Sequence, residues 1–203
     1  MSGIADREHY DELVAKLVLG AKTSAWIATA NVKDLHVEAP VGTRARAQGR
    51  FVSMLESLRD LARRGVEIRL LHGAKPSGPF RAQLARLTAA GKTGVAMRHC
   101  PRVHLKLVAV DGRALYLGSA NFTGAGLGAK GDGRRNFEMG VVTDDELFLD
   151  WAQARFDAIW RGQECASCKL RRECPNPIDT IENKKKRIGN KEPEPERERK
   201  GAR

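Results

Sequence analysis

Residues 104–121 of this 203-residue chain, HLKLVAVDGRALYLGSAN, decide the fold that the rest of the sequence builds around them. Mostly apolar side chains lie on both sides of Asp111-Gly112, and an Asp-Gly pair between two such runs is a strong short-range indication of a β-hairpin. We therefore expect residues 103–110 and 114–118 to form neighbouring antiparallel strands.

Polar side chains with complementary chemistry lie at the open end of this hairpin. Because alternate residues of a strand share a face, His104 and Lys106 point the same way. Ser119 and Asn121, also two residues apart, follow the second strand to the same rim. An imidazole can attack phosphorus, while an ammonium, a hydroxyl and an amide can hold the non-bridging oxygens. Glu138 on the next strand can accept a hydrogen bond from the far nitrogen of the imidazole and fix its tautomer. The pattern predicts phosphoryl transfer that needs no metal ion or other cofactor.

The remaining elements alternate between helices and strands. Apolar residues at helical or strand spacing predict where each element begins and ends. The expected helices span residues 11–21, 51–64, 80–90 and 144–161, the expected strands 25–32, 66–70, 95–100 and 137–143, and the expected loops 35–50 and 124–135. This order predicts an α/β fold with a central mixed β-sheet flanked by helices. The glycine-rich second loop lacks the Gly-Lys-Ser/Thr ending of a P-loop, and we expect a flexible flap there.

The hairpin and its polar residues resemble the His-Lys-Asp signature of the phospholipase D superfamily, in which Asp111 is the acidic member. The segments NFT (121–123) and NFE (136–138) are also similar to the pattern of that family. The resemblance covers residues 10–162, and its specific part is confined to 104–142.

The resemblance implies phosphodiester chemistry through a phosphohistidine intermediate, in a phospholipase D-like sandwich that we assign to residues 1–162. Asp111 lies at the turn, away from the phosphate, and we expect a structural role for it. The side chains implied for catalysis are the nucleophile His104, the phosphate-binding Lys106, Asn121 and Ser119, and the orienting Glu138.

The family mechanism uses two histidines, one of which attacks while the other protonates the leaving oxygen and then activates water. Only His104 among the five histidines of this chain has the motif around it. A symmetric dimer would place two copies of His104 across one phosphate. The chain resembles the small dimeric bacterial endonucleases of the family, so we expect an active homodimer and an inactive monomer.

Charge favours a nucleic-acid substrate, either DNA or RNA. The chain has a formal net charge of +11, which suits a polyanionic partner. Two loops that we expect on the rim of the site are basic and suit a phosphate backbone, although solvated loop charge is the alternative explanation. The nucleic-acid-binding residues that we predict in them are Arg44, Arg46, Arg50, Lys130, Arg134 and Arg135.

Two other functions stay open at this stage. A lipid-headgroup hydrolase would carry an apolar rim or a membrane-entry helix, and we find neither in the sequence. A nucleic-acid-binding subunit of a bacterial defence or restriction assembly would use the same basic loops, with cleavage secondary. The charged start lacks the apolar core of a signal peptide, and no apolar run is long enough to span a bilayer, so we expect a cytoplasmic protein.

Three cysteines in the segment 163–178 have C-x2-C-x5-C spacing, which begins like a zinc knuckle. The fourth ligand would come from Cys100 or His99, at the end of the strand before the motif, if the segment folds back. We predict structural zinc, with an iron–sulfur cluster or reduced thiols as alternatives. The metal ligands of this prediction are Cys165, Cys168, Cys174 and Cys100.

The last segment, 179–203, is nearly all charge, proline, glycine and asparagine. It cannot bury enough apolar surface to fold alone, and we expect a disordered tail. Its basic run from Lys184 could bind nucleic acid without specificity, and a plain solvated terminus explains it equally well.

Overall fold

The computed structural model describes residues 1–180, and its core is a seven-stranded mixed sheet. The strands of this sheet are β1 Ser2–Ala5, β2 Ser24–Thr29, β5 Glu67–His72, β6 Val95–His99, β7 Leu107–Val110, β8 Ala114–Gly118 and β9 Met139–Thr143, and a separate pair consists of β3 His36–Glu38 and β4 Phe51–Ser53. The order in the main sheet is β1-β9-β8-β7-β2-β5-β6. Strands β2, β5 and β6 run parallel, and the other neighbours in this sheet are antiparallel.

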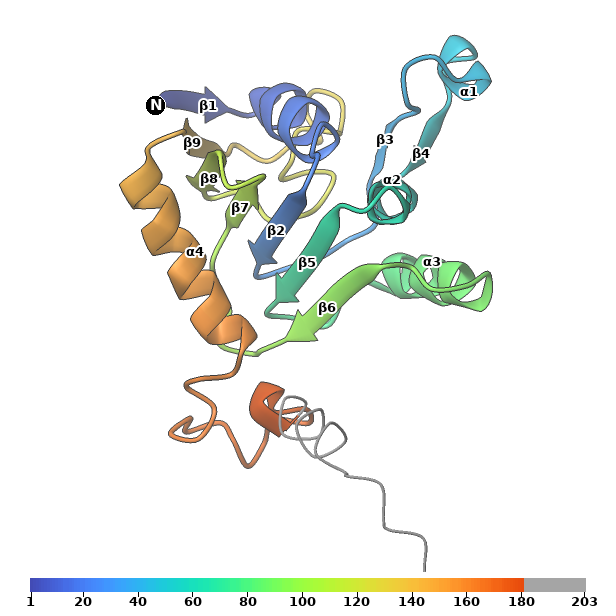
Figure 1. Ribbon diagram of the computed structural model, residues 1–203. Helices are drawn as coiled ribbons and strands as arrows, with labels where there is room; N and C mark the ends of the chain where they lie inside the picture. The colour runs from blue at the N-terminus through green and yellow to red at the C-terminus, as the bar shows by residue number, and fades with distance from the viewer. Residues whose placement is uncertain (181–203) are drawn as a thin grey trace, which may run out of the picture.

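Helices cover both faces of this sheet (Figure 1). They are the π-helix η1 His9–Val18 and the α-helices α1 Arg44–Ala47, α2 Met54–Arg63, α3 Gly78–Ala89 and α4 Glu146–Trp160. One face packs against η1, α2 and α3, and α4 crosses the other. The predicted α/β fold with a central mixed sheet is confirmed. No helix within residues 1–180 is long and apolar enough to cross a membrane.

Strand β7 serves both layers of the fold. Val108 and Val110 are buried in the cluster formed with η1, α2 and α3, while Leu107 and Ala109 are buried against α4. Successive side chains of a strand point to opposite faces, so four apolar residues in a row are typical of a strand that is covered on both sides. The position of β7 between β2 and β8 fits this pattern.

The predicted hairpin is present, and its turn has the backbone that the sequence requires. Asp111 and Gly112 have φ angles of 55° and 62°, the positive values that a type I′ turn requires. The N–H of Arg113 donates to the Val110 carbonyl at 3.0 Å and closes this turn, and the strand pairing begins with Val110 opposite Ala114. Strands β7 and β8 pair with Leu107 opposite Leu117.

The expected loop over 35–50 and the expected helix start at Phe51 are both corrected by the structure. Strands β3 and β4 form an arm beside the main sheet, with α1 at its tip (Figure 1). The Ser53 hydroxyl accepts a hydrogen bond from the Leu55 N–H at 3.2 Å and caps α2, so the helix begins at Met54. Phe51, expected as the first residue of that helix, is exposed on β4.

Two strands of the main sheet start later than expected, and one was not expected. Strand β7 begins at Leu107 and β9 at Met139, so the polar residues that precede them lie in loops rather than in strands. Strand β1 adds to the edge of β9. Its four residues include a serine and a glycine and carry no clear alternation, which is why the sequence pattern did not indicate a strand there.

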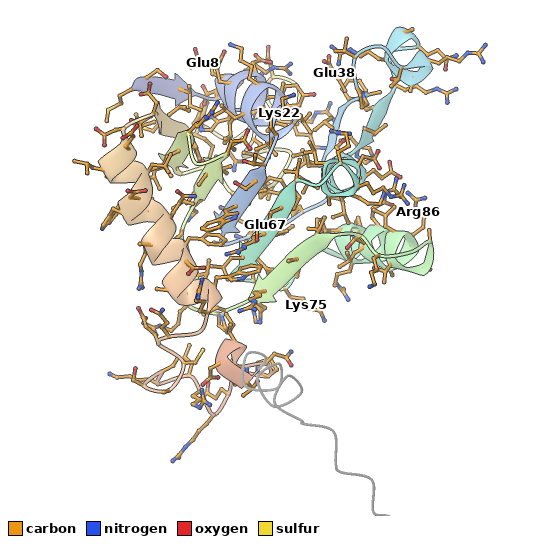
Figure 2. All side chains as sticks on the ribbon, viewed as in Figure 1. Glu8, Lys22, Glu38, Glu67, Lys75 and Arg86 are labelled. Atoms are coloured by element: carbon orange, nitrogen blue, oxygen red, sulfur yellow. The ribbon has the colours of Figure 1, made fainter. Side chains whose placement is uncertain are left out.

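Asp111 ties the hairpin turn to the chain that enters β2. Its carboxylate accepts hydrogen bonds from the backbone N–H groups of Lys22 at 2.9 Å, Thr23 at 2.7 Å and Ser24 at 2.9 Å. Burial by itself would raise the pKa of Asp111, but these hydrogen bonds outweigh it and hold the pKa below its usual value. Figure 2 shows Lys22 at the end of the sheet opposite Lys75, which follows the carboxyl end of β5.

Replacing Asp111 with Ala should lower the free energy of unfolding by about 2–4 kcal/mol at pH 7, because three backbone N–H groups lose their acceptor. Since the folded pKa lies below the unfolded value of about 3.9, the contribution is complete above about pH 5 and is lost as the pH falls through the folded pKa. Urea unfolding of both proteins at pH 7 and pH 3 measures this. A difference that is equally large at pH 3 would contradict the proposed clamp.

Candidate active site

His104 and Lys106 lie side by side in the extended segment that leads into β7. Nζ of Lys106 lies 3.0 Å from Nδ1 of His104 and donates to the His104 carbonyl at 3.0 Å. His104 is exposed, whereas Leu105 packs against the cluster under α4. The predicted alternation of side chains is therefore present, although the strand itself starts at Leu107. Because an ammonium group only donates, the ring nitrogen that it meets is an acceptor, as a nucleophile must be.

The end of β8 brings Ser119 to the same edge of the sheet. The N–H of Gly118 donates to the carbonyl of Lys106 at 3.2 Å, which extends the hairpin pairing one step beyond β7. Ser119 follows at once, and its exposed hydroxyl donates a hydrogen bond to the carboxylate of Glu138. The N–H of Met139 donates to the same hydroxyl at 3.1 Å. The start of β7, the end of β8 and the start of β9 therefore meet at this edge.

Asn121 is held against the carboxyl end of β2. Its Oδ1 accepts a hydrogen bond from the backbone N–H of Asn31 at 3.1 Å, and the Thr29 hydroxyl accepts one from the N–H of Phe122 at 3.0 Å. Since a backbone N–H can only donate, the network assigns the amide oxygen to Asn31 and leaves the amide nitrogen on the other side. Within residues 1–180 this nitrogen has no hydrogen-bond partner, so its two donors are available to an anion.

Glu138 lies just before β9 and is partly buried. Its carboxylate accepts hydrogen bonds from the Ser119 hydroxyl and, at 3.0 Å, from Nδ2 of Asn136. Its backbone N–H donates to the Asp6 carboxylate at 3.0 Å. In the described part of the chain no hydrogen bond joins Glu138 to His104, so its orienting role stays a prediction, and the contact that the structure shows is with Ser119.

A buried histidine that the sequence did not single out supports this edge from inside the fold. Nε2 of His9 lies 3.0 Å from the hydroxyl of Tyr116, which accepts from the N–H of Ala120 at 3.4 Å. Nδ1 of His9 lies 3.1 Å from the Asp6 carbonyl, which can only accept. The ring proton is therefore on Nδ1, and the Tyr116 hydroxyl donates to Nε2. Through Ala120 and Asp6 the network reaches both the turn after β8 and the backbone of Glu138.

Burial determines how these two side chains titrate. It lowers the pKa of His9 and raises the pKa of Tyr116 to about 12, so both are neutral near pH 7. The two residues are 107 positions apart, and nothing in the periodicity of either segment pairs them. His9 also precedes the helix expected over residues 11–21, so the sequence pattern gave no indication of its role.

The basic residues that were expected on one rim occupy two separate places. Arg44 and Arg46 belong to α1, and Arg46 is paired with Glu38. Helix α1 lies at the tip of the β3–β4 arm, away from the carboxyl ends of β2, β5 and β6 (Figure 1). Figure 2 likewise shows Glu38 far from Lys75. We expected this loop, which also carries Arg50, to border the site, and the structure corrects that expectation. Pairing of β3 with β4 directs the loop away from the site.

The glycine-rich loop does border the site, because it connects Asn121 to Glu138. Its basic residues Lys130 and Arg134 are exposed, and Arg135 is paired with Asp132. The first half of this loop is not the free flap that was expected, since Leu127 is only 2% exposed and belongs to the main core cluster.

All four cysteines line one small cavity below the carboxyl end of β6. None of them forms a disulfide within the described residues, and burial raises the pKa of the Cys100 thiol. In residues 1–180 no three His, Cys, Asp or Glu side chains surround a common point as metal ligands, so the metal centre stays a prediction. The last predicted domain, 179–203, lies almost wholly outside the described residues.

Comparison with known proteins places this fold in a family. Residues 16–160 match the family described as "Cardiolipin synthase, PLD-like domain". No curated protein matches the chain. Among solved structures the chain is similar to a phospholipase D family member, Nuc, from Salmonella typhimurium, with a TM-score of 0.54 and 19% identity over 79% of this chain and 93% of that one.

Two other solved structures have a similar fold. NucT from Helicobacter pylori gives a TM-score of 0.52 and 15% identity over 77% of this chain and 92% of that one. Polyphosphate kinase from Porphyromonas gingivalis gives a TM-score of 0.52 and 15% identity over 79% of this chain and 26% of that one. The matched residues, which include most of this mixed sheet, form a phospholipase D-like domain. Since the matched family spans most of the chain, the chain belongs to the phospholipase D superfamily.

Replacing His9 with Phe should lower the free energy of unfolding by about 2–3 kcal/mol at pH 7.5, because the buried Tyr116 hydroxyl loses its acceptor. The folded pKa of His9 lies below the unfolded value of about 6.5. Its contribution is therefore complete above about pH 6.5 and is lost as the pH falls through the folded pKa. The difference in the free energy of unfolding between wild type and variant, measured by urea unfolding, should become smaller as the pH is lowered from 7.5 to 5.

Tyr116→Phe is the matched control for this experiment, because it removes the hydroxyl and keeps the buried imidazole. It should lose stability at pH 7.5 and retain the pH dependence that His9→Phe lacks. The same pH dependence in all three proteins would contradict the assignment of a neutral, buried His9.

Proposed function

We propose that the protein is a metal-independent phosphodiesterase that cleaves DNA or RNA through a phosphohistidine, at a site completed by a second copy of the chain. Membership of the phospholipase D superfamily supports phosphodiester chemistry. The single observation that carries the proposal is the exposed imidazole of His104 with the ammonium of Lys106 3.0 Å from its ring. A place of action in the cytoplasm belongs to the same proposal.

In this mechanism a ring nitrogen of His104 forms a bond to phosphorus while the bond to the leaving oxygen breaks. The leaving oxygen takes a proton from the imidazolium of the partner's His104. That imidazole, now neutral, takes a proton from water, whose oxygen attacks phosphorus and releases His104. Each protomer supplies one histidine, since the sequence carries the motif once.

The other side chains at this edge would hold the phosphate. Lys106 would place its ammonium beside the nucleophile, and the amide nitrogen of Asn121 offers two donors to the non-bridging oxygens. Such fixed donors stabilise the charge of the transition state more than that of the ground state. Ser119 would assist, held in place by Glu138.

Support for the second copy comes from apolar side chains beside the site. Phe137 is 96% exposed and Met139 is 73% exposed, and they flank Glu138 in the sequence. Exposed apolar side chains gain from being covered, and contiguous ones are typical of a contact with another molecule. A symmetric partner placed on this edge would cover them and bring its own histidine to the same phosphate.

Support for nucleic acid comes from charge. The net charge of +11 and the exposed Lys130 and Arg134 on the loop beside the site suit a polyanionic backbone. Lipid-headgroup chemistry is the second candidate, because the matched family is described by a lipid synthase and the exposed Phe137 could meet acyl chains. A binding subunit of a defence assembly is the third.

Incubation of the protein with plasmid DNA, RNA and phospholipid vesicles in EDTA tests these candidates. We expect nicking of nucleic acid, reduced by at least about 10⁴-fold in His104→Ala, which lacks the nucleophile, and by about 10²–10³-fold in Lys106→Ala. His36→Ala, which removes an exposed histidine on β3, is the control and should be unaffected.

Release of a lipid headgroup without nicking would overturn the nuclease assignment. Tight binding of nucleic acid without cleavage, unchanged in His104→Ala, would instead favour the binding subunit.

Replacing Phe137 with Asp should weaken self-association by about 30-fold or more, because a charge enters the apolar contact. Sedimentation equilibrium at micromolar concentration should show a dimer for the wild type and a monomer for the variant, with activity following the dimer fraction as concentration rises. Val41→Asp, which changes an exposed apolar residue of the arm, is the matched control. A monomer with full activity would refute the shared site.

A further inference from the structure

Four cysteines from two distant parts of the chain meet at one place in the fold. Cys100 directly follows β6, and the other three follow α4. All four line one cavity of about 30 Å³. Figure 1 shows the segment after α4 below the carboxyl ends of β5 and β6. The candidate active site lies at the same end of these strands. The cysteines that lie in that segment are Cys165, Cys168 and Cys174.

The C-terminal segment is anchored independently of these thiols. Ile178 is only 2% exposed and belongs to the same buried cluster as Phe156 and Trp160 of α4. Nη1 of Arg171 lies 2.7 Å from a carboxylate oxygen of Asp179. The loop between α4 and Ile178 is therefore closed back onto the domain, and its cysteines face Cys100 across the cavity.

Cys100 fits the role of fourth ligand better than His99. Nε2 of His99 lies 2.9 Å from the Gly73 carbonyl, and its ring packs 5.2 Å from that of His72. That carbonyl can only accept, so Nε2 carries the proton, and only Nδ1 of His99 is left to bind a metal. Cys100 contacts the same buried cluster as Cys165.

The surroundings suit a centre with net negative charge. Arg102 and Arg171 line the cavity. Four thiolates around a divalent ion leave two negative charges, which such cations stabilise. The cavity also exceeds the space that one water needs, about 10–15 Å³, so a single ion has room in it.

We propose that Cys100, Cys165, Cys168 and Cys174 form a tetrathiolate metal centre that fastens the nucleophile-bearing loop to the C-terminal segment. Zinc, at about 2.3 Å from each sulfur, is the expected occupant, because the cavity is small. The thiols line the cavity without surrounding a common point in the described residues, so binding of the ion would draw them together.

The consequence for the active site follows from the backbone. The N–H of Cys100 donates to the His72 carbonyl at 3.0 Å, and the N–H of Val103 donates to the Cys100 carbonyl at 2.9 Å. Val103 passes very close to Gly73: a Cβ added to Gly73 would lie 2.0 Å from the carbonyl oxygen of Val103. His104 is the next residue, so a metal bound to Cys100 would restrain the turn that positions the imidazole.

Metal analysis of the purified full-length protein, which needs no substrate and so stands apart from the proposed nuclease activity, tests the centre. We expect about one zinc per chain. Iron with equimolar sulfide and absorption near 400 nm would support the same four ligands with an iron–sulfur cluster as occupant. Protein prepared without oxygen that contains neither, and that does not take up either one when it is supplied, would overturn the proposal.

Variants identify the ligands and the link to the catalytic loop. Each Cys→Ser change should reduce the metal content at least tenfold and lower Tm by about 5 °C or more. Ser167→Ala, which lies between two of the cysteines and removes no thiol, should keep the metal. Hydrogen exchange at residues 100–106 should be faster in Cys165→Ser, although that substitution lies in another segment. Full metal content in Cys100→Ser, or unchanged exchange of this loop after metal loss, would refute the proposed link.

Discussion

The pairing of β7 with β8 is the constraint on which the site depends. Leu107 lies opposite Leu117, and the same antiparallel pairing continues from Lys106 to Gly118. This register puts the residues before β7 and those after β8 at one edge of the sheet. A shift by one residue would turn every side chain of β7 to the other face, which would exchange the residues packed in the two layers and move Lys106 away from Gly118. Core packing and site assembly therefore require the same alignment.

The edge is also where the two halves of the sheet meet. Strand β2 runs parallel to β5 and antiparallel to β7, so its carboxyl end lies beside the start of β7. Thr29 and Asn31 at that end hold Asn121 and its neighbour by hydrogen bonds. Open α/β sheets commonly bind ligands outside the carboxyl ends of their strands, and the proposed phosphate site lies at such an edge.

The candidate catalytic side chains lie on loops, and each loop is positioned by a different buried contact. Gly73 allows Val103 to pass closely beneath His104, and the His9–Tyr116 pair supports the turn after β8 and, through Asp6, Glu138. The proposed tetrathiolate centre would add a restraint on the first of these loops. Positioning of this kind is what a nucleophile and its phosphate-binding donors require.

The sequence alone determined the hairpin, because Asp111-Gly112 permits the positive φ of a tight turn and the apolar runs beside it demand burial on both faces. It also indicated the mixed α/β fold and the adjacency of His104 and Lys106, which follows from the local two-residue period. Only the tertiary structure decided what depends on contacts between distant segments: the outward β3–β4 arm that carries Arg44 and Arg46, the buried pairing of His9 with Tyr116, and the convergence of Cys100 with the cysteines after α4. The periodicity of one segment does not indicate which distant segment it contacts, because that contact depends on how the helices pack against the sheet.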